Sequence, residues 1–169
     1  AKDPEIAISY VDDPVSTGTN NGVVYYDTNR KAKIVITGRT TTWDDTLPVI
    51  NITAVNSQDE PVANAYEISG WTTVEGSKPD DAIHTAYITF KGNAKYNFTV
   101  DYTDKANRTA VQAASNIFVV DHNNPTGTIT VKNSTWDKLI SALTFGLWSN
   151  ESVNVSATYD DETSAIKSV

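Results

Sequence analysis

The chain is built from short runs in which apolar and polar residues alternate, and clusters of Asn, Asp, Gly and Pro separate these runs. In the clearest run, 95–102, Tyr96, Phe98, Val100 and Tyr102 fall on one side of an extended chain. A period of two is the pattern of a β-strand that buries one of its faces. Runs of this kind recur along most of the chain, so we expect an all-β protein.

The number of runs narrows the fold class further. About seven of them fit into the first ~120 residues, which is the strand count of an immunoglobulin-like (Ig-like) β-sandwich. The sequence therefore predicts an Ig-like β-sandwich over residues 1–121. The runs that support this prediction are 5–11, 23–26, 30–37, 48–55, 66–71, 84–91, 95–102 and 116–120.

A polar linker at 121–127 follows the last of these runs. Beyond it, residues 122–169 contain two further strand patterns and one stretch, 134–143, whose apolar residues recur at the i, i+3, i+4 and i+7 spacing of a helix face. Segments this small seldom fold alone without disulfides or metals. We expect 122–169 to be the N-terminal part of a truncated second Ig-like domain with one short helix.

Composition excludes several classes of function. The formal net charge is −8, and such a field repels nucleic acid and anionic membrane surfaces. The chain has no Cys, which removes disulfides, thiolate catalysis and thiolate metal sites. It also has no apolar run of the roughly 18 residues that a membrane span needs.

Three segments resemble the bacterial Ig-like repeat domains of Firmicutes cell-surface proteins, including those of gut Gram-positive species. The segment 98–107 is similar to the penultimate strand and turn of such repeats, and 125–136 is similar to their start. The segment 92–98 is similar to the tyrosine corner of Ig domains, with Phe98 where a disulfide-forming Cys would stand.

This resemblance implies a secreted or cell-surface location, with cell-wall anchoring through a region outside this fragment. It also implies a repetitive parent protein. Some gut proteins of this kind capture host immunoglobulin, so an immunoglobulin is one partner that the resemblance suggests. An Ig-like fold by itself does not specify a ligand.

Catalytic patterns are sparse in this sequence. There are only two histidines, His84 and His122, and neither a G-x-S-x-G nor an H-E-x-x-H motif is present. We therefore expect no enzymatic activity and no catalytic residues.

Acidic residues at strand ends and turns suggest calcium as the one candidate cofactor, because calcium prefers carboxylate and carbonyl oxygens. If the ends of these strands meet at the pole between the two domains, their carboxylates form an oxygen cluster. The alternative is that Asp serves here as a turn former and as a solubilising charge. The candidate metal ligands are Asp12, Asp13, Asp101, Asp104 and Asp121.

Aromatic residues are the candidates for a binding surface, since they supply contact area at low entropic cost. We expect Trp43, in a polar Thr/Asp loop, to be the exposed tryptophan, whereas Trp71 and Trp136 suit the core better. The remaining candidates for ligand contact are Tyr25, Tyr26 and Trp148.

Three functions remain open at this point. The first is recognition of a host or neighbouring-cell protein through edge strands and loops. The second is carbohydrate binding as an accessory module of a glycan-active protein, which an exposed row of aromatic rings would favour. The third is a structural spacer without a ligand, which a uniformly polar, acidic surface would favour.

Overall fold

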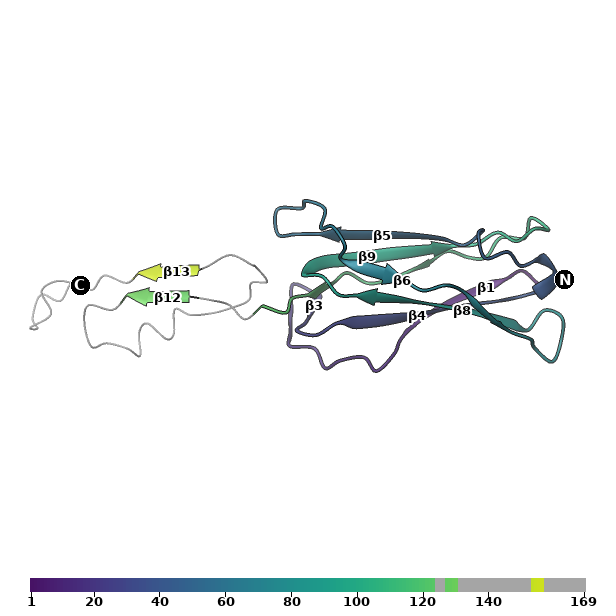
Figure 1. The fold of residues 1–169 in the computed structure, drawn as a ribbon, viewed down its shortest axis with the longest axis horizontal. Coiled ribbons are helices and arrows are strands. Elements are labelled where there is room, and N and C mark those ends of the chain that lie inside the picture. The colour runs from purple at the N-terminus through teal and green to yellow at the C-terminus, as the bar shows by residue number, and fades with distance from the viewer. Residues whose placement is uncertain (124–126, 131–152, 157–169) are drawn as a thin grey trace, which may run out of the picture. The chain divides into compact units, whose positions relative to one another are not determined.

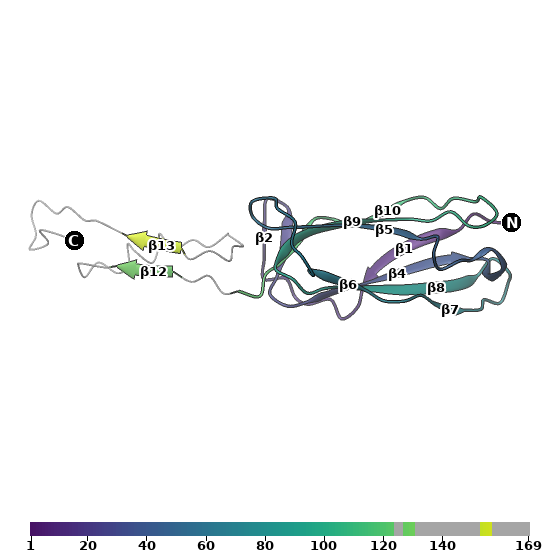
Figure 2. The same ribbon diagram turned by 45° about the horizontal axis from the view of Figure 1, so that its top comes forward.

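The computed structural model describes residues 1–123, 127–130 and 153–156 of the chain. Over these residues the regular structure is β-strand, apart from one 3₁₀ turn, η1, at Thr40–Thr42. The chain divides into two compact units, Ala1–His122 and Asn123–Val169. In the first unit the strands run side by side in two layers (Figure 1, Figure 2). The predicted all-β class is confirmed.

The first sheet of unit 1 has five antiparallel strands in the order β1-β4-β8-β6, and β7 also pairs with β8. The long strands β4 and β8 form its centre, whereas β1 lies at one edge and the short β6 and β7 share the other. The strands are β1 (Glu5–Tyr10), β4 (Arg30–Gly38), β6 (Tyr66–Ile68), β7 (Thr72–Val74) and β8 (Ala82–Phe90).

The second sheet has the order β10-β9-β11-β3-β2, with β5 on the other side of β9. All its pairs are antiparallel except β3 with β11, which is parallel. The strands are β2 (Gly18–Asn20), β3 (Val23–Tyr26), β5 (Val49–Val55), β9 (Ala94–Asp101), β10 (Ala113–Ala114) and β11 (Phe118–Val120).

The core lies between the two sheets and follows the predicted alternation. In β4 the inward residues Ala32, Ile34 and Ile36 are fully buried, and every second residue of β8 and β9 is buried as well. Successive side chains of a strand point to opposite faces of the sheet. Apolar residues at every second position are therefore enough to identify the face that packs into the core. The predicted inward faces of 30–37, 84–91 and 95–102 are confirmed.

Extra residues interrupt the sheets at two places, between β6 and β7 and between β10 and β11. Ile68 pairs with Ile88, but Thr72 pairs with Thr85. Three residues between β6 and β7 therefore lie opposite only two residues of β8. The same offset separates β10 from β11. An extra residue of this kind is a β-bulge, which bends an edge strand and reduces unwanted pairing. The predicted single runs 66–71 and 116–120 are therefore shorter strands than the alternation suggested.

In the second unit, β12 (Gly127–Thr130) and β13 (Val153–Ser156) form a parallel pair. They overlap the two strand patterns expected in this part of the chain, 128–131 and 152–159. The predicted helix at 134–143, together with Trp136 and Trp148, lies outside the described residues. Within the described ranges, no helix has the length and apolar character needed to cross a membrane.

Candidate binding groove

The predicted exposed tryptophan, Trp43, is instead half-buried in an aromatic cluster. Its ring stacks on His84 with the centroids 3.7 Å apart, and it lies 5.3 Å from Trp71 and 5.1 Å from Tyr102. The polar neighbours that suggested exposure bond among themselves, because the Asp44 carboxylate accepts from the backbone and hydroxyl of Thr46. The prediction that Trp43 is exposed is wrong.

The two tyrosines do not share a surface either. Tyr26 is 6% exposed, and its ring contacts Phe118 and the guanidinium of Arg30. Tyr25 is the preceding residue of β3 and is half-buried on the opposite face of that strand. Tyr26 is therefore a core residue, which corrects its assignment to a binding surface. Trp148, the fourth aromatic candidate, lies outside the described residues.

The five predicted calcium ligands lie at different ends of the sandwich. Val120 pairs with Ala94 at the start of β9, so Asp121 lies near that end, whereas Asp101 is the last residue of the same strand. Eight residues of strand span roughly 25 Å. In the described part of the chain, no three carboxylates or imidazoles come close enough to hold a metal ion. The predicted single oxygen cluster is wrong.

One of these carboxylates holds a buried arginine. Asp13 accepts from Nε and Nη2 of Arg30 at 2.8 and 3.0 Å, and the Arg30 guanidinium lies 3.4 Å from the centroid of the Tyr10 ring. The other carboxylates divide between turns and exposed contacts: Asp12 has a positive φ of 45°, and Asp101 accepts from Gln112. The position of Asp12 agrees with the alternative that Asp serves as a turn former, whereas the Asp13–Arg30 pair was not predicted.

Asp104 has the densest set of hydrogen bonds among them. Its carboxylate accepts from the backbone N–H of Ala106 and Arg108, from the Thr42 hydroxyl and from the Arg108 guanidinium. Burial raises the pKa of Asp104, but these donors outweigh it and lower the pKa to about 2. Both carboxylate oxygens therefore accept hydrogen bonds that hold the turn after β9 against η1.

His84 is the one fully buried imidazole in the described residues. Its Nδ1 lies 2.8 Å from the Thr73 hydroxyl, one ring face stacks on Trp43, and Nε2 has no hydrogen-bond partner. Burial lowers the pKa of His84, and the charge of Glu75 offsets this only in part. His84 is two residues before Ala86 in the alternating series Ala86, Ile88 and Phe90. The sequence therefore contained a signal for the burial of His84.

This burial predicts acid-sensitive stability. Because folding lowers the pKa of His84, the unfolded chain takes up the proton first as the pH falls below about 6.5. We expect the urea midpoint of unfolding to fall between pH 7.5 and pH 5.5, and His84→Phe to flatten this decline. The matched variant His122→Gln keeps His84 and should retain the decline. An unchanged pH profile in His84→Phe would remove His84 as the cause.

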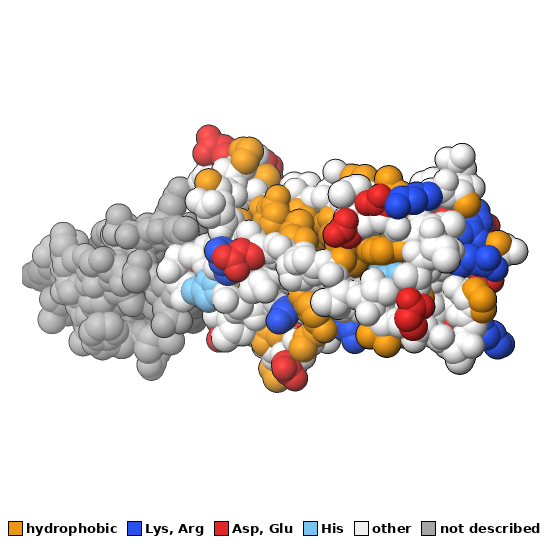
Figure 3. Space-filling view, turned by 45° about the vertical axis from the view of Figure 1, so that its right-hand side comes forward, with side chains coloured by type: hydrophobic (Ala, Val, Ile, Leu, Met, Phe, Trp, Pro, Cys, Tyr) orange, Lys and Arg blue, Asp and Glu red, His pale blue; other side chains and the backbone are white. Residues whose placement is uncertain are grey.

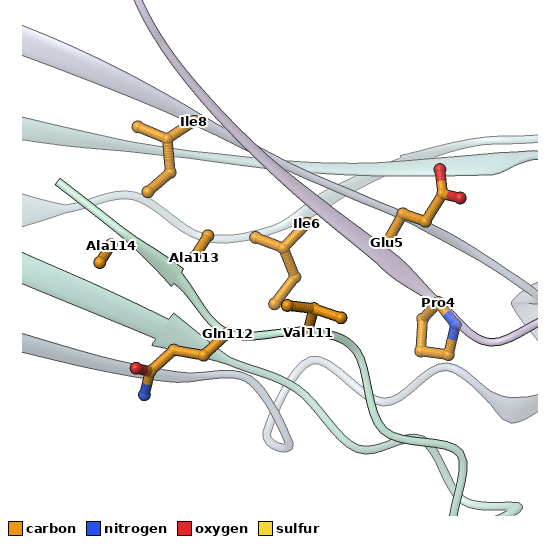
Figure 4. A pocket seen from close by; sticks show the side chains of 8 residues that line it. All are labelled: Pro4, Glu5, Ile6, Ile8, Val111, Gln112, Ala113 and Ala114. Atoms are coloured by element: carbon orange, nitrogen blue, oxygen red, sulfur yellow. The ribbon is translucent and has the colours of Figure 1, made fainter.

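An open groove separates the edge strand β1 from β10. It has a volume of about 520 Å³, and its lining comes from Pro4–Ile6 and Ile8 on one side and from 111–114 on the other. Ile6 points toward Val111, and Ile8 points toward Ala113 (Figure 4). Val111 at the rim is 88% exposed. The groove therefore has apolar walls that are open to solvent.

The groove exists because β3 covers only part of the neighbouring strand edge. β3 pairs with β11 only from Val24 to Tyr26, and it is preceded by a turn at Asn21-Gly22, where φ is 51° and 79°. Positive φ at both central residues is the geometry of a type I′ hairpin turn, and glycine adopts it without strain. β2 precedes this turn and pairs with the side of β3 away from β11, so among the described strands none follows the outer edge of β10.

The backbone of β10 consequently presents free hydrogen-bonding groups. The N–H of Ser115 donates to the Phe98 carbonyl at 2.9 Å, so by alternation Ala113 also faces β9. The N–H and C=O of Gln112 and Ala114 then point to the unpaired edge. Sequence analysis missed this edge because 111–115 lacks the alternation of large apolar residues that marks a strand.

One face of the described surface is mixed in composition. On the face shown in Figure 3, apolar side chains form several separate patches, and charged side chains lie between them and at the end of the sandwich. The groove differs from these patches because it combines apolar walls with unpaired backbone groups. A partner in extended conformation could use both features at once.

Comparison of the chain with known protein families, with curated proteins and with solved structures gives no match.

Proposed function

We propose that this chain is a non-catalytic Ig-like module of a bacterial cell-surface protein, and that it binds a partner protein by adding an extended segment of that partner to the free edge of β10. The free edge beside the apolar groove is the observation that carries this proposal. In such strand addition the main-chain hydrogen bonds provide affinity, and the pockets beside the strand select side chains.

The strand order supports the Ig-like part of the proposal. β1-β4-β8-β6 corresponds to the A-B-E-D sheet of Ig domains, and β5-β9-β11 corresponds to the C-F-G sheet. β10 continues the G position before its bulge, and β3 lies beside β11 as a parallel strand.

A tyrosine near the start of β9 supports it as well. The Tyr96 hydroxyl lies 2.7 Å from the Gly92 carbonyl oxygen and 2.8 Å from that of Ala65, and it accepts the Gly92 N–H at 3.1 Å. A tyrosine that bonds back to the backbone a few residues upstream is the tyrosine corner of Ig domains. The resemblance of 92–98 thus has a matching set of contacts.

Both histidines have structural partners, which supports a non-catalytic role. His84 is enclosed by Trp43 and Thr73. His122, the last residue of unit 1, contacts the side-chain oxygens of Asn93 and Asn29, each at 2.8 Å. The proposed location at the cell surface, and immunoglobulin as a specific partner, are supported by the sequence resemblance.

The proposal is tested by blocking the edge without disturbing the fold. Ala114→Pro removes an N–H that points away from β9, so we expect it to leave the unfolding midpoint nearly unchanged. Ala114→Thr is the matched control, because it keeps that N–H. The immobilised 169-residue chain would be exposed to purified immunoglobulins G and A and then to serum and mucosal proteins, with calcium present or chelated.

We expect captured protein to bind the parent chain and Ala114→Thr similarly, and to bind Ala114→Pro about tenfold or more weakly, a difference of about 1.4 kcal/mol. Equal binding to all three chains would place the site elsewhere. A glycan array run in parallel separates the other functions: glycan capture alone would indicate a carbohydrate module, and no capture in either arm would indicate a spacer.

A further inference from the structure

The turn between β2 and β3 contains the one Asn-Gly pair of the sequence, Asn21-Gly22. Both residues are exposed, and both have positive φ, 51° and 79°. A Cβ built on Gly22 would meet no atom within 4 Å beyond its chain neighbours. The space around the Gly22 backbone is therefore open on the side where other residues carry a side chain.

An asparagine carboxamide that precedes glycine can react with its own main chain, and this reactivity is one source of the heat lability of asparagine. The backbone nitrogen of Gly22 attacks Cγ of Asn21 and forms a new C–N bond, which closes a five-membered succinimide ring. The Asn21 amide nitrogen leaves as ammonia, which carries away the proton of the Gly22 nitrogen through water. A water molecule then opens either C–N bond of the ring and leaves aspartate or isoaspartate. Because nucleophile and electrophile belong to adjacent residues, the first step is intramolecular.

The hairpin leaves the attacking nitrogen accessible. Asn20 and Val23 are the last paired residues of β2 and β3, so the Gly22 N–H lies in the two-residue turn and outside the ladder. Glycine has no Cβ to shield that nitrogen, and it rotates through backbone conformations that other residues avoid. An accessible nitrogen and a main chain free to rotate therefore occur at the same peptide bond.

Attack requires the turn to leave its type I′ conformation, and β2 offers little resistance to this. β2 has three residues, all exposed, and it lies at the edge of the second sheet with β3 as its neighbour. A short edge strand without buried side chains opens at low cost in free energy. β3 is held separately, because it pairs with β11 and buries Tyr26. The turn can therefore open while the rest of unit 1 stays folded.

Other asparagines that precede a small residue in the described part of the chain are held in place. Asn56 precedes Ser57, and its side-chain oxygen accepts from the backbone N–H of Gln58 and of Glu60, each at 2.9 Å. Its amide also donates to the Glu60 carboxylate at 3.3 Å. The two remaining pairs have a buried alanine in second place: Asn64-Ala65 and Asn93-Ala94. Asn21 is therefore the asparagine that the fold leaves open to this reaction.

We propose that Asn21 is a self-modification site, at which the folded chain converts asparagine into a mixture of aspartate and isoaspartate. Water is the co-reactant, and ammonia is the product that leaves. Each event adds one negative charge to a chain whose net charge is already −8. The proposal is independent of the groove, because the turn supplies both reacting groups.

The isoaspartate form should loosen the hairpin. Isoaspartate places an additional carbon atom in the main chain, and a two-residue turn does not accommodate it without moving its flanking pair, Asn20 and Val23. The Thr17 N–H, which donates to the Tyr25 carbonyl at 2.8 Å, should then exchange with solvent faster. The edge of β3 that β2 covers would become unpaired, so the modification would create a second free strand edge.

Peptide mapping of the full 169-residue chain, incubated at neutral and mildly alkaline pH, tests this proposal. We expect the mass gain of an amide-to-acid conversion at Asn21, at a rate that rises with pH. The rate at Asn56 should be lower by about a hundredfold or more, because its hydrogen bonds must break first. The matched control is Asn21→Gly, which keeps a sequence suited to a type I′ turn but lacks the carboxamide and should gain no mass there.

A synthetic peptide of residues 18–26, incubated beside the chain, verifies that the conditions support the reaction. Modification of this peptide without modification of Asn21 in the folded chain would overturn the proposal, and so would equal rates at Asn21 and Asn56. Anion exchange separates the more acidic product, in which hydrogen exchange at Thr17 is then compared with the parent chain. An unchanged exchange rate in the isoaspartate form would overturn the predicted loosening of the hairpin.

Discussion

Replacing Asp104 by Ala should lower the free energy of unfolding by about 3–5 kcal/mol, because it leaves the Arg108 guanidinium without its partner. The Arg108 side chain is only 15% exposed and bonds both to Asp104 and to the Thr42 hydroxyl. The loss also frees two backbone N–H groups, of Ala106 and Arg108. Urea titration at pH 7 followed by tryptophan fluorescence measures the change.

Asp101→Ala is the matched control for this experiment. Asp101 bonds to the exposed amide of Gln112, so its removal should cost less than about 1 kcal/mol. The double variant Asp104→Ala/Arg108→Ala should recover part of the loss, since no unpaired guanidinium remains. Equal costs for Asp104→Ala and Asp101→Ala would show that the Asp104–Arg108 pair does not fasten the turn.

Asp104 also makes the stability of the folded chain fall at low pH. Its pKa of about 2 in the folded chain lies below the ordinary value of 3.8, so its stabilising effect is complete above about pH 4 and is lost as the pH falls toward 2. Asp104→Ala should flatten this part of the pH profile. A smaller slope should remain from Asp44, whose pKa is also about 2 because it accepts hydrogen bonds from Thr46.

Replacing Phe118 by Ala should cost about 3–5 kcal/mol of stability, which is the range for a large aromatic core residue. The Phe118 ring packs against Phe90 with the centroids 5.0 Å apart and against Tyr96 at 5.4 Å. It also contacts the Tyr10 and Tyr26 rings and the Arg30 guanidinium. Because domains are stable by only about 5–15 kcal/mol, the variant should unfold at a much lower urea concentration.

The neighbouring residue supplies the control for Phe118. Ile117 is 47% exposed, and Ile117→Ala should change stability by less than about 1 kcal/mol. Phe118→Leu, which keeps most of the apolar volume, should fall between the two. If Phe118→Ala behaves like Ile117→Ala, then the short strand β11 does not contribute to the core.

Much of the layer structure follows from local patterning. The period of two identified the inward residues of the long strands β4, β8 and β9, because burial of one face is enough to select them. The same rule also bore on the candidate site: adjacent residues of a strand point to opposite faces, so Tyr25 and Tyr26 cannot both belong to one surface. Applying it there would have identified one of the two tyrosines as a core residue.

Other features depend on contacts that the sequence does not display. Trp43 lies in a polar segment, and only the tertiary packing of His84 and Tyr102 draws its ring inward. The distance between Asp101 and Asp121 depends on which ends of β9 and β11 meet, and alternation carries no information about pairing. The free edge of β10 arises from a turn at Asn21-Gly22, some ninety residues earlier in the chain.

The parallel pairing of β3 with β11 also bears on how this chain is made. Val24 in β3 lies opposite Phe118, so the two halves of one ladder are separated by most of the first unit. Ladders between distant segments form late, because the intervening loop must be ordered first. During synthesis, β3 must therefore wait until β11 has left the ribosome. Until then its apolar residues stay accessible to chaperones and to neighbouring chains.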